Sequence, residues 1–338
     1  MSFKISWLAS GMVLSLLSVA AAFAQDVKER SIKLAFVNTA DSAHGVGAKR
    51  LAEVVAQKSG GKLTLKLFPS GTLGGEAVVA SSMQGGTIEM SMMGPGLLTG
   101  VDRAFGVFDT PFLFDSFKEV DGALDGPIGS KLLDKLPVKG LVGLSYWDHG
   151  FRILTNSRRP INKLEDVQGL KIRVQQIAVF IDAFNALGAN AVPMPFTELY
   201  TALETKAVDG QENPFVSAEV TKFYEVQKYA SATRHAYSPL LVLVSKKFWD
   251  QLSEAERKIL SEAANEVKPY QRQVSREMDA KAVETLKGKG MAINEVSEQE
   301  RARMRERLQP VVDKHKQAVG ELAGEMTAAI EKIRTGAN

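Results

Sequence analysis

The chain contains no cysteine among its 338 residues. This absence excludes a disulfide framework, cysteine metal ligands and a lipid anchor on cysteine. The fold must therefore be stable without covalent cross-links. A chain of this length buries a large share of its unfolded surface, so it does not need them.

Histidine is scarce, and the sequence has no common catalytic motif. The four histidines lie far apart and have no cysteine beside them, which gives little support for a metal site. No G-x-S-x-G, H-E-x-x-H, P-loop or strand-following G-x-G-x-x-G pattern occurs. Residues 71–75 are glycine-rich but lack the P-loop lysine, so they are interpreted as a tight turn into a helix. The sequence thus predicts no enzyme, no cofactor and no metal. The histidines are His44, His149, His235 and His315.

Long blocks of like charge are also missing. The formal net charge is +3, and basic and acidic residues are interspersed along the chain. Nucleic-acid-binding proteins usually carry a clustered basic surface, so we expect no nucleic-acid partner.

The one long apolar run is at the N-terminus. Lys4 precedes an apolar stretch over residues 8–21, and an Ala-x-Ala pattern ends at Ala24. This order is typical of a secretory signal peptide over residues 1–24, with Gln25 as the first mature residue. The run is too short and too rich in small residues for a membrane span. We therefore expect a periplasmic protein.

Strand and helix patterns alternate in the first part of the chain, which predicts a parallel sheet covered on both faces. Two further strands, 140–146 and 151–156, bracket residues 147–150, interpreted as a passage between two lobes. The first predicted elements are a strand at 32–37, a helix at 44–58, a strand at 63–68, a helix at 76–84 and a strand at 88–92.

A second strand–helix unit follows, and residues 238–244 form a strand that returns toward the first lobe. The expected division is a signal peptide over 1–24, lobe 1 over 25–149, lobe 2 over 150–237 and a final segment over 238–338. The second unit comprises a strand at 171–174, a helix at 177–187, a strand at 191–194 and a helix at 198–205.

The final segment is predicted to be helical. Capping-box patterns at residues 253–256 and 297–300 mark two helix starts. The first of these helices carries a long apolar stripe, which predicts packing across both lobes. The stripe is Ala255, Ile259, Ala263, Val267, Val274, Met278, Ala282 and Leu286.

Arg173 lies near the carboxyl end of a predicted strand, where open α/β sheets commonly place their ligands. Its guanidinium presents a rigid fork of donors that matches a carboxylate or phosphate. From residue types alone, a solvent-exposed sheet edge explains Arg173 and Lys171 equally well.

Other candidate residues likewise allow either a structural or a ligand-binding interpretation. Residues 211–214 follow a predicted strand and read either as an ordinary turn or as a turn that points Asn213 into a cleft. Arg152 is either a surface ion-pair residue or a ligand contact. Trp147, Phe196 and Phe215 are aromatic residues that suit either a core or a ligand platform.

Three motifs together resemble the substrate-binding proteins of tripartite ATP-independent periplasmic (TRAP) transporters. They are PSGTLGGE at 69–76, GFRILTN at 150–156, and KIRV at 171–174 with GANAVPMPFTELYTALETKAVDGQENP at 188–214. The resemblance extends from about residue 32 to beyond residue 286. It implies an α/β, two-lobed, type II-like periplasmic solute-binding fold with a long helix that spans both lobes.

The resemblance also implies roles for particular residues. Arg173 matches the arginine that binds the ligand carboxylate, and Asn213 the asparagine that contacts the same ligand. Arg152 matches a second, less uniform arginine, and Phe196 an aromatic beside the ligand. First-lobe contacts are less regular in this family; the candidates here are Asn38, His44, Glu76 and Trp147.

The implied function is the capture of a small organic acid, such as a sugar acid or dicarboxylate, for TRAP membrane subunits. The sequence does not indicate an oligomeric state, and a monomer is the default expectation. A ligand sensor that uses the same cleft and signals to a membrane receptor is the alternative.

Overall fold

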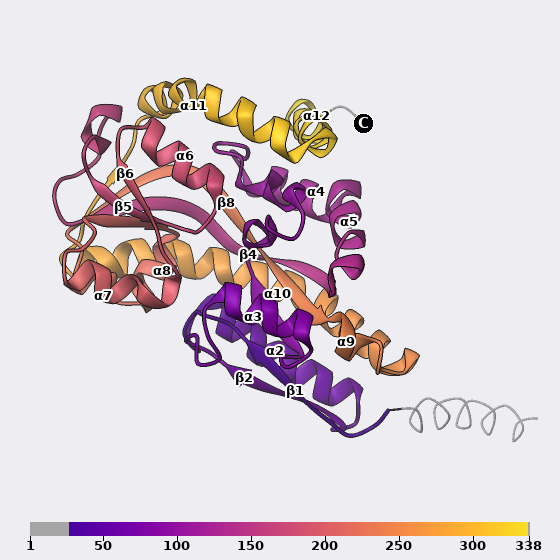
Figure 1. The fold of residues 1–338 in the computed structure, drawn as a ribbon. Coiled ribbons are helices and arrows are strands. Elements are labelled where there is room, and N and C mark those ends of the chain that lie inside the picture. The colour runs from indigo at the N-terminus through magenta and orange to yellow at the C-terminus, as the bar shows by residue number, and fades with distance from the viewer. Residues whose placement is uncertain (1–26, 337–338) are drawn as a thin grey trace, which may run out of the picture.

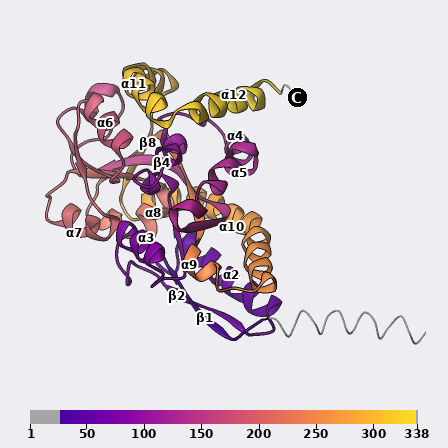
Figure 2. The ribbon, with the colours of Figure 1, turned by 45° about the vertical axis from the view of Figure 1, so that its right-hand side comes forward.

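The computed structural model of the protein describes residues 27–336. The expected signal peptide over 1–24 and its cleavage before Gln25 lie outside the described residues. Two groups of elements are joined by long strands in the middle of the molecule (Figure 1). In both views, α11 and α12 lie at the opposite end from β1 and β2 (Figure 2).

Nine strands of the described chain form one mixed sheet in the order β2-β1-β3-β8-β4-β7-β5-β6, and β9 pairs with β8. The strands are β1 (Arg30–Ala35), β2 (Leu63–Phe68), β3 (Met90–Met93), β4 (Leu141–Asn156), β5 (Lys171–Val174), β6 (Asn190–Pro193), β7 (Gly210–Asn213), β8 (Tyr229–Ser245) and β9 (Ala292–Glu295).

The long strands β4 and β8 connect the two halves of the sheet. They pair antiparallel from Leu141 opposite Ser245 to Asn156 opposite Tyr229. We expected two separate strands around residues 147–150; the structure instead has one strand with a bulge near Gly150, whose φ is +131°. The proposed lobe boundaries at 149/150 and 237/238 therefore fall inside continuous strands.

In the first half, β2, β1 and β3 are parallel, as predicted. Apolar residues of β1 face both ways: Ile32 and Leu34 pack against α2, while Ala35 packs toward α3. The helices of this half are α2 (Ala43–Lys58), α3 (Glu76–Gly85), α4 (Phe117–Asp125) and α5 (Pro127–Asp134), with short 3-10 turns η1 (Pro95–Leu98), η2 (Arg103–Asp109) and η3 (Pro137–Lys139).

In the second half, Ile172 and Val174 of β5 pack with the apolar residues of α6, and Arg173 points to the other face. The expected turn at residues 211–214 is wrong, because Gly210–Asn213 is the buried strand β7 between β4 and β5. The remaining elements are η4 (Leu164–Val167), α6 (Ala178–Ala186), η5 (Phe196–Glu198), α7 (Leu199–Glu204), α8 (Phe215–Val220) and η6 (Phe223–Glu225).

The long helix is α10 (Glu254–Gly288), which has 35 residues. Ser253 and Glu256 form the predicted capping box at its start. It packs against α2, β4 and α8, so it contacts both halves, and most of its predicted stripe is buried or partly buried. The predicted fold class is confirmed.

The chain then returns to both halves. After α9 (Lys246–Trp249) and α10, α11 (Glu298–Val319) packs on α6 and α12 (Glu321–Thr335) packs on α4. Ser297 caps α11, but Glu300 accepts a hydrogen bond from the Leu164 amide and does not complete the second expected capping box. No helix between residues 27 and 336 has both the length and the apolarity of a bilayer span.

Candidate anion-binding site

The side chain of Arg173 is buried, with 2% of its surface exposed. Its Nε and Nη2 donate to the Met194 carbonyl oxygen at 2.9 and 2.7 Å. Its Nη1 has no hydrogen-bond partner among the described residues. Burial lowers the pKa of Arg173 to about 10, so the side chain remains a cation at neutral pH. The result is a buried positive charge with donors still to be satisfied.

Arg152 is fully buried on β4, but it already has its partners. Its Nε forms a short ion pair with Glu212 of β7, and its Nη2 donates to the Glu212 carbonyl oxygen at 2.5 Å. Burial alone would raise the pKa of Glu212, but the nearby charge of Arg152 and hydrogen bonds lower it to about 2. Arg152 is thus neutralised by an ionised carboxylate, whereas Arg173 forms no such ion pair within residues 27–336.

Asn213 joins the two parts of the site. Its Oδ1 accepts a hydrogen bond from Arg152 Nη2 at 3.1 Å, and its Nδ2 donates to Gln211 Oε1 at 2.6 Å. Asn213 and Gln211 are buried at the end of β7. The structure therefore places Asn213 beside Arg152, with its amide group held inside the protein.

Asp109, at the end of η2, is part of the site although the sequence analysis did not find it. Burial raises its pKa to about 8, against the opposing effect of Arg152, so its carboxyl group is mostly neutral at pH 7. Its Oδ2 has no hydrogen-bond partner in the described chain. A Cβ at Gly96 would lie 1.9 Å from this oxygen, so only glycine permits this approach.

The rings of buried His44 and partly buried His149 are in contact, with centroids 4.6 Å apart. Burial lowers the pKa of His44 to about 3 and that of His149 well below its ordinary value, so both rings are neutral. His149 Nε2 lies 3.0 Å from Ser217 Oγ. Two neutral imidazoles present both donor and acceptor nitrogens, which suits hydroxyl groups.

Glu76 begins α3 and lies near both arginines. Burial raises the pKa of Glu76, while the charges of Arg173 and Arg152 oppose that rise. The loop before Glu76 touches the opposite half, because a Cβ at Gly71 would lie 2.5 Å from Thr197 Cγ2. The two halves are thus in contact at Gly71 and Thr197, and both arginines are buried, so the site is closed.

Phe196 in η5 stands beside Arg173. The guanidinium carbon of Arg173 lies 6.0 Å from the Phe196 ring centroid, and the Phe223 ring centroid is 6.3 Å from that of Phe196. The Phe196 ring thus forms one wall around the cation.

Two other expected contacts are placed differently. Trp147 is fully buried in a core cluster, and its indole N–H donates to the Ala264 carbonyl oxygen of α10 at 3.2 Å. It is therefore a core residue, and we withdraw it as a ligand contact. Asn38 is buried after β1, where its carbonyl oxygen accepts a hydrogen bond from the Ser70 amide, and its side chain forms no hydrogen bond with Arg152 or Arg173.

The sequence analysis also missed Glu212, His149 and His235. His235 Nε2 lies 3.5 Å from Glu212 Oε2 and has no hydrogen bond in the described chain. Glu212 lies inside the quoted GQENP motif, which could have indicated its role. Asp109 and His149 lie in segments without a comparable signal.

The chain was compared with known proteins. A family described as "Bacterial extracellular solute-binding protein, family 7" matches residues 34–318. The 2,3-diketo-L-gulonate-binding periplasmic protein YiaO of Escherichia coli (strain K12) is 39% identical over 78% of this chain and 80% of its own. The C4-dicarboxylate-binding periplasmic protein DctP of Rhodobacter capsulatus is 34% identical over 86% of this chain and 87% of its own.

A solved structure shows the same fold. The sugar acid binding protein DctPAm from Advenella mimigardefordensis, in complex with galactonate, is 44% identical and superimposes with a TM-score of 0.90. The match covers 91% of this chain and 100% of that one.

Proposed function

Because this chain belongs to bacterial extracellular solute-binding protein family 7, whose members serve TRAP transporters, we propose that it binds a polyhydroxylated monocarboxylate, a sugar acid. The ligand binds between the two halves and is delivered to a TRAP membrane transporter. The galactonate complex of the Advenella protein and the diketogulonate named for YiaO support this substrate class.

The single observation that carries the proposal is the unsatisfied Arg173 guanidinium. The Met194 carbonyl oxygen accepts from Nε and Nη2, which leaves Nη1 and the second N–H of Nη2 on the neighbouring edge. That edge matches the two oxygens of a carboxylate. A buried cation without these bonds is costly, so an anion that completes them stabilises the closed site.

The rest of the site favours hydroxyl groups over a second carboxylate. Arg152 is neutralised by Glu212, so the site has one cation available for one anion. Asp109, Glu76 and the neutral His44–His149 pair supply donors and acceptors but no further positive charge. A C4-dicarboxylate would place its second negative charge near these acidic groups.

The expected binding free energies agree with one carboxylate contact supplemented by hydroxyl contacts. A micromolar ligand requires about 8 kcal/mol of binding free energy. Each hydrogen bond to a charged group contributes about 1.5–3 kcal/mol. One carboxylate–arginine pair therefore falls short of micromolar affinity, and the hydroxyl contacts together with closure of the halves contribute the remainder.

The test is calorimetry with galactonate as the probe and succinate as the comparison. We expect the wild-type protein to bind galactonate at least tenfold more tightly than succinate. Arg173→Ala should abolish binding of both acids, because no other free cation among residues 27–336 faces the site. Lys171→Ala is the matched control, since Lys171 is exposed on the same strand and should leave affinity unchanged. Wild-type affinity in a folded Arg173→Ala protein would refute the proposal.

Arg173→Lys tests the geometry of the interaction. An ammonium group cannot form two parallel hydrogen bonds, so we expect affinity for galactonate to fall at least tenfold. The same calorimetric titration measures it, and near-normal affinity would contradict a bidentate contact.

We further propose that the mature chain is a periplasmic monomer beginning at Gln25 and that it releases its ligand chemically unchanged. Mass spectrometry of the secreted protein tests the start at Gln25, and light scattering tests the monomer. NMR of the recovered ligand tests whether it is unchanged, and a new product would indicate an enzyme instead.

A further inference from the structure

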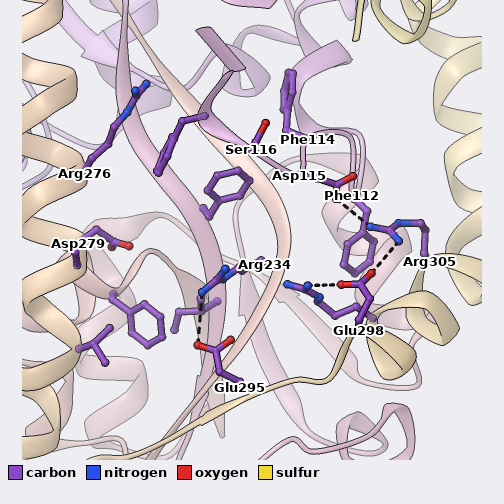
Figure 3. A pocket seen from close by; sticks show the side chains of 17 residues that line it. Phe112, Phe114, Asp115, Ser116, Arg234, Arg276, Asp279, Glu295, Glu298 and Arg305 are labelled. Atoms are coloured by element: carbon purple, nitrogen blue, oxygen red, sulfur yellow. Dashed lines mark hydrogen bonds and ion pairs between the residues drawn. The ribbon is translucent and has the colours of Figure 1, made fainter. Parts of the chain in front are cut away.

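A cavity of about 710 Å³ is lined by residues that do not include Arg173 (Figure 3). The sheet order places β7 and β5 on one side of the β4–β8 pair and β9 on the other. Arg173 belongs to the β5 side, whereas Glu295 of β9 lines the cavity. The cavity is therefore separate from the anion-binding site.

Aromatic rings form much of the cavity wall. Phe117 of α4 and Phe151 of β4 are in contact, with ring centroids 5.2 Å apart. Phe215, Ile153 and Val283 add further apolar surface. This lining is suited to an apolar body about the size of one ring.

Four arginines also line the cavity, and two of them are each paired with two carboxylates. Arg276 pairs with Asp148 at 2.7 Å and with Asp121 at 2.5 Å, and lies over the Phe117 ring. Arg305 pairs with Asp115 at 3.1 Å and with Glu298 at 3.6 Å, and lies over the Phe112 ring. The charges of these two arginines are therefore balanced within the protein.

Arg234 and Arg301 are different. Arg234 has a single ion pair, to Glu295 at 3.5 Å, and its guanidinium forms no hydrogen bond within residues 27–336. Arg301 pairs with Glu298, and its buried Nε has no partner in that part of the chain. Figure 3 shows the Arg234 side chain pointing into the cavity. Unused donors thus face an aromatic wall.

The backbone at Arg234 is also unusual. Arg234 has φ +46°, a conformation that residues other than glycine rarely adopt. It lies in the irregular stretch of β8 between Ser231 and Ala236, opposite Ile153. Such conformations persist only where surrounding structure holds them, and they concentrate at functional sites.

The acidic residues around the cavity leave N–H donors of Arg234 and Arg301 free. Glu295 and Glu298 have 69% and 65% of their side chains exposed and Arg234 has 50%, so these three residues lie at the rim of the cavity, whereas Arg301 is more enclosed, with 24% exposed. Asp279 accepts a hydrogen bond from the Val216 amide at the start of α8 and is committed there.

We propose that this cavity is a second binding site, for a monocarboxylate with an aromatic or branched apolar body. Arg234 and Arg301 bind the carboxylate, and the body lies against Phe117, Phe151 and Phe215. The walls come from both halves, since Phe117 packs with the first-half core and Arg301 lies on α11 of the second. An occupant therefore favours the closed arrangement and tightens sugar-acid binding.

Methyl NMR with phenylacetate as the probe tests the site directly. Ile153 lines this cavity, whereas Ile177 lies beside Gly96 near Asp109, so the two isoleucine methyl groups report the two sites separately. We expect phenylacetate to shift the Ile153 methyl signal in a saturable manner. Acetate lacks the aromatic body and 2-phenylethanol lacks the carboxylate, so each should bind at least tenfold more weakly than phenylacetate.

Arg234→Ala should weaken phenylacetate binding at least tenfold, and Arg303→Ala is the matched control. Arg303 lies on the same helix as Arg301 but pairs with Glu165 and Glu300 outside the cavity. A shift confined to Ile177, or an Ile153 shift unchanged in Arg234→Ala, overturns the second site.

A separate titration tests the coupling between this cavity and the anion-binding site. Phenylacetate at saturation should tighten galactonate binding about fivefold, the lower end of typical couplings between sites. Unchanged galactonate affinity would contradict the coupling. Absence of galactonate binding altogether would instead show as an unresponsive Ile177 signal and would refute the proposed function, leaving the phenylacetate result intact.

Discussion

Two buried guanidiniums at the centre of the molecule have different roles. Arg152 is bonded to Glu212, Asn213 and Ser238, and its charge is balanced inside the protein. Within the described residues, Arg173 has a single acceptor, the Met194 carbonyl oxygen. Both arginines fit a carboxylate by chemistry alone, and only their surroundings distinguish a structural residue from one that requires a ligand.

Asp109 makes ligand affinity depend on pH in a predictable direction. Its pKa is raised to about 8, so it is mostly protonated at pH 7 and able to donate a hydrogen bond. As the pH rises through 8, the carboxyl ionises beside the ligand anion. We expect galactonate affinity to fall about tenfold by pH 9, measured by calorimetry.

Asp109→Asn supplies the control for that dependence. The amide keeps a neutral donor and does not titrate, so its affinity should stay nearly constant from pH 7 to 9. An equally steep fall in the variant would assign the pH effect to another group.

At the scale of elements, the bulge at Gly150 is one of three register shifts in the pairing of β4 with β8. Gly150 has φ +131°, and a Cβ there would lie 3.4 Å from Pro214. We expect Gly150→Ala to lower the free energy of unfolding by about 1–2 kcal/mol, measured by urea denaturation.

Gly324→Ala in α12 is the matched substitution. An added Cβ there meets no atom within 4 Å, and alanine favours the helix by about 0.5–1 kcal/mol. Equal destabilisation by both substitutions would show that the bulge has no special requirement for glycine.

The sequence predicted short elements well and long strands poorly. Strand alternation and a helical run placed β2 and α2 to within a residue or so, because each repeats a regular pattern. β4 was divided in two because its bulge interrupts the alternation. β7 was taken for a turn because Gln211, Glu212 and Asn213 are polar, although all three are buried by site contacts.

Prediction of the site had a similar limit. Arg173, Asn213, Arg152 and Phe196 lie in contiguous motifs, and the structure brings them together. Asp109 reaches the site only because η1 and η2 fold beside β4 and β8, a juxtaposition that no local pattern in the sequence contains.

At the scale of the whole molecule, closure is defined by the loop before α3 meeting the turn before α7. A Cβ at Gly75 would lie 3.7 Å from Thr197 Oγ1, so side chains at these two positions meet across the two halves. The absence of native cysteine makes a designed pair unambiguous. We expect Gly75→Cys with Thr197→Cys to cross-link faster when galactonate is bound and to slow ligand release, measured by gel shift and stopped flow.

The single variants Gly75→Cys and Thr197→Cys are the controls and should show no internal cross-link. A pair that never oxidises, with or without galactonate, would contradict the closed contact between the loop and the turn.

The path of the chain has a consequence for biogenesis. β8 is inserted between β3 and β4, and α12 returns to cover α4, so both halves receive essential parts from the last third of the polypeptide. A nascent chain that stops before residue 229 leaves the edge of β3 bare and cannot acquire native packing. Ribosome-arrested chains of that length should be degraded by a protease that spares the finished protein. Synthesis of the chain is therefore complete before its folding can be complete. The polypeptide would still be unfolded when it enters a translocation pore.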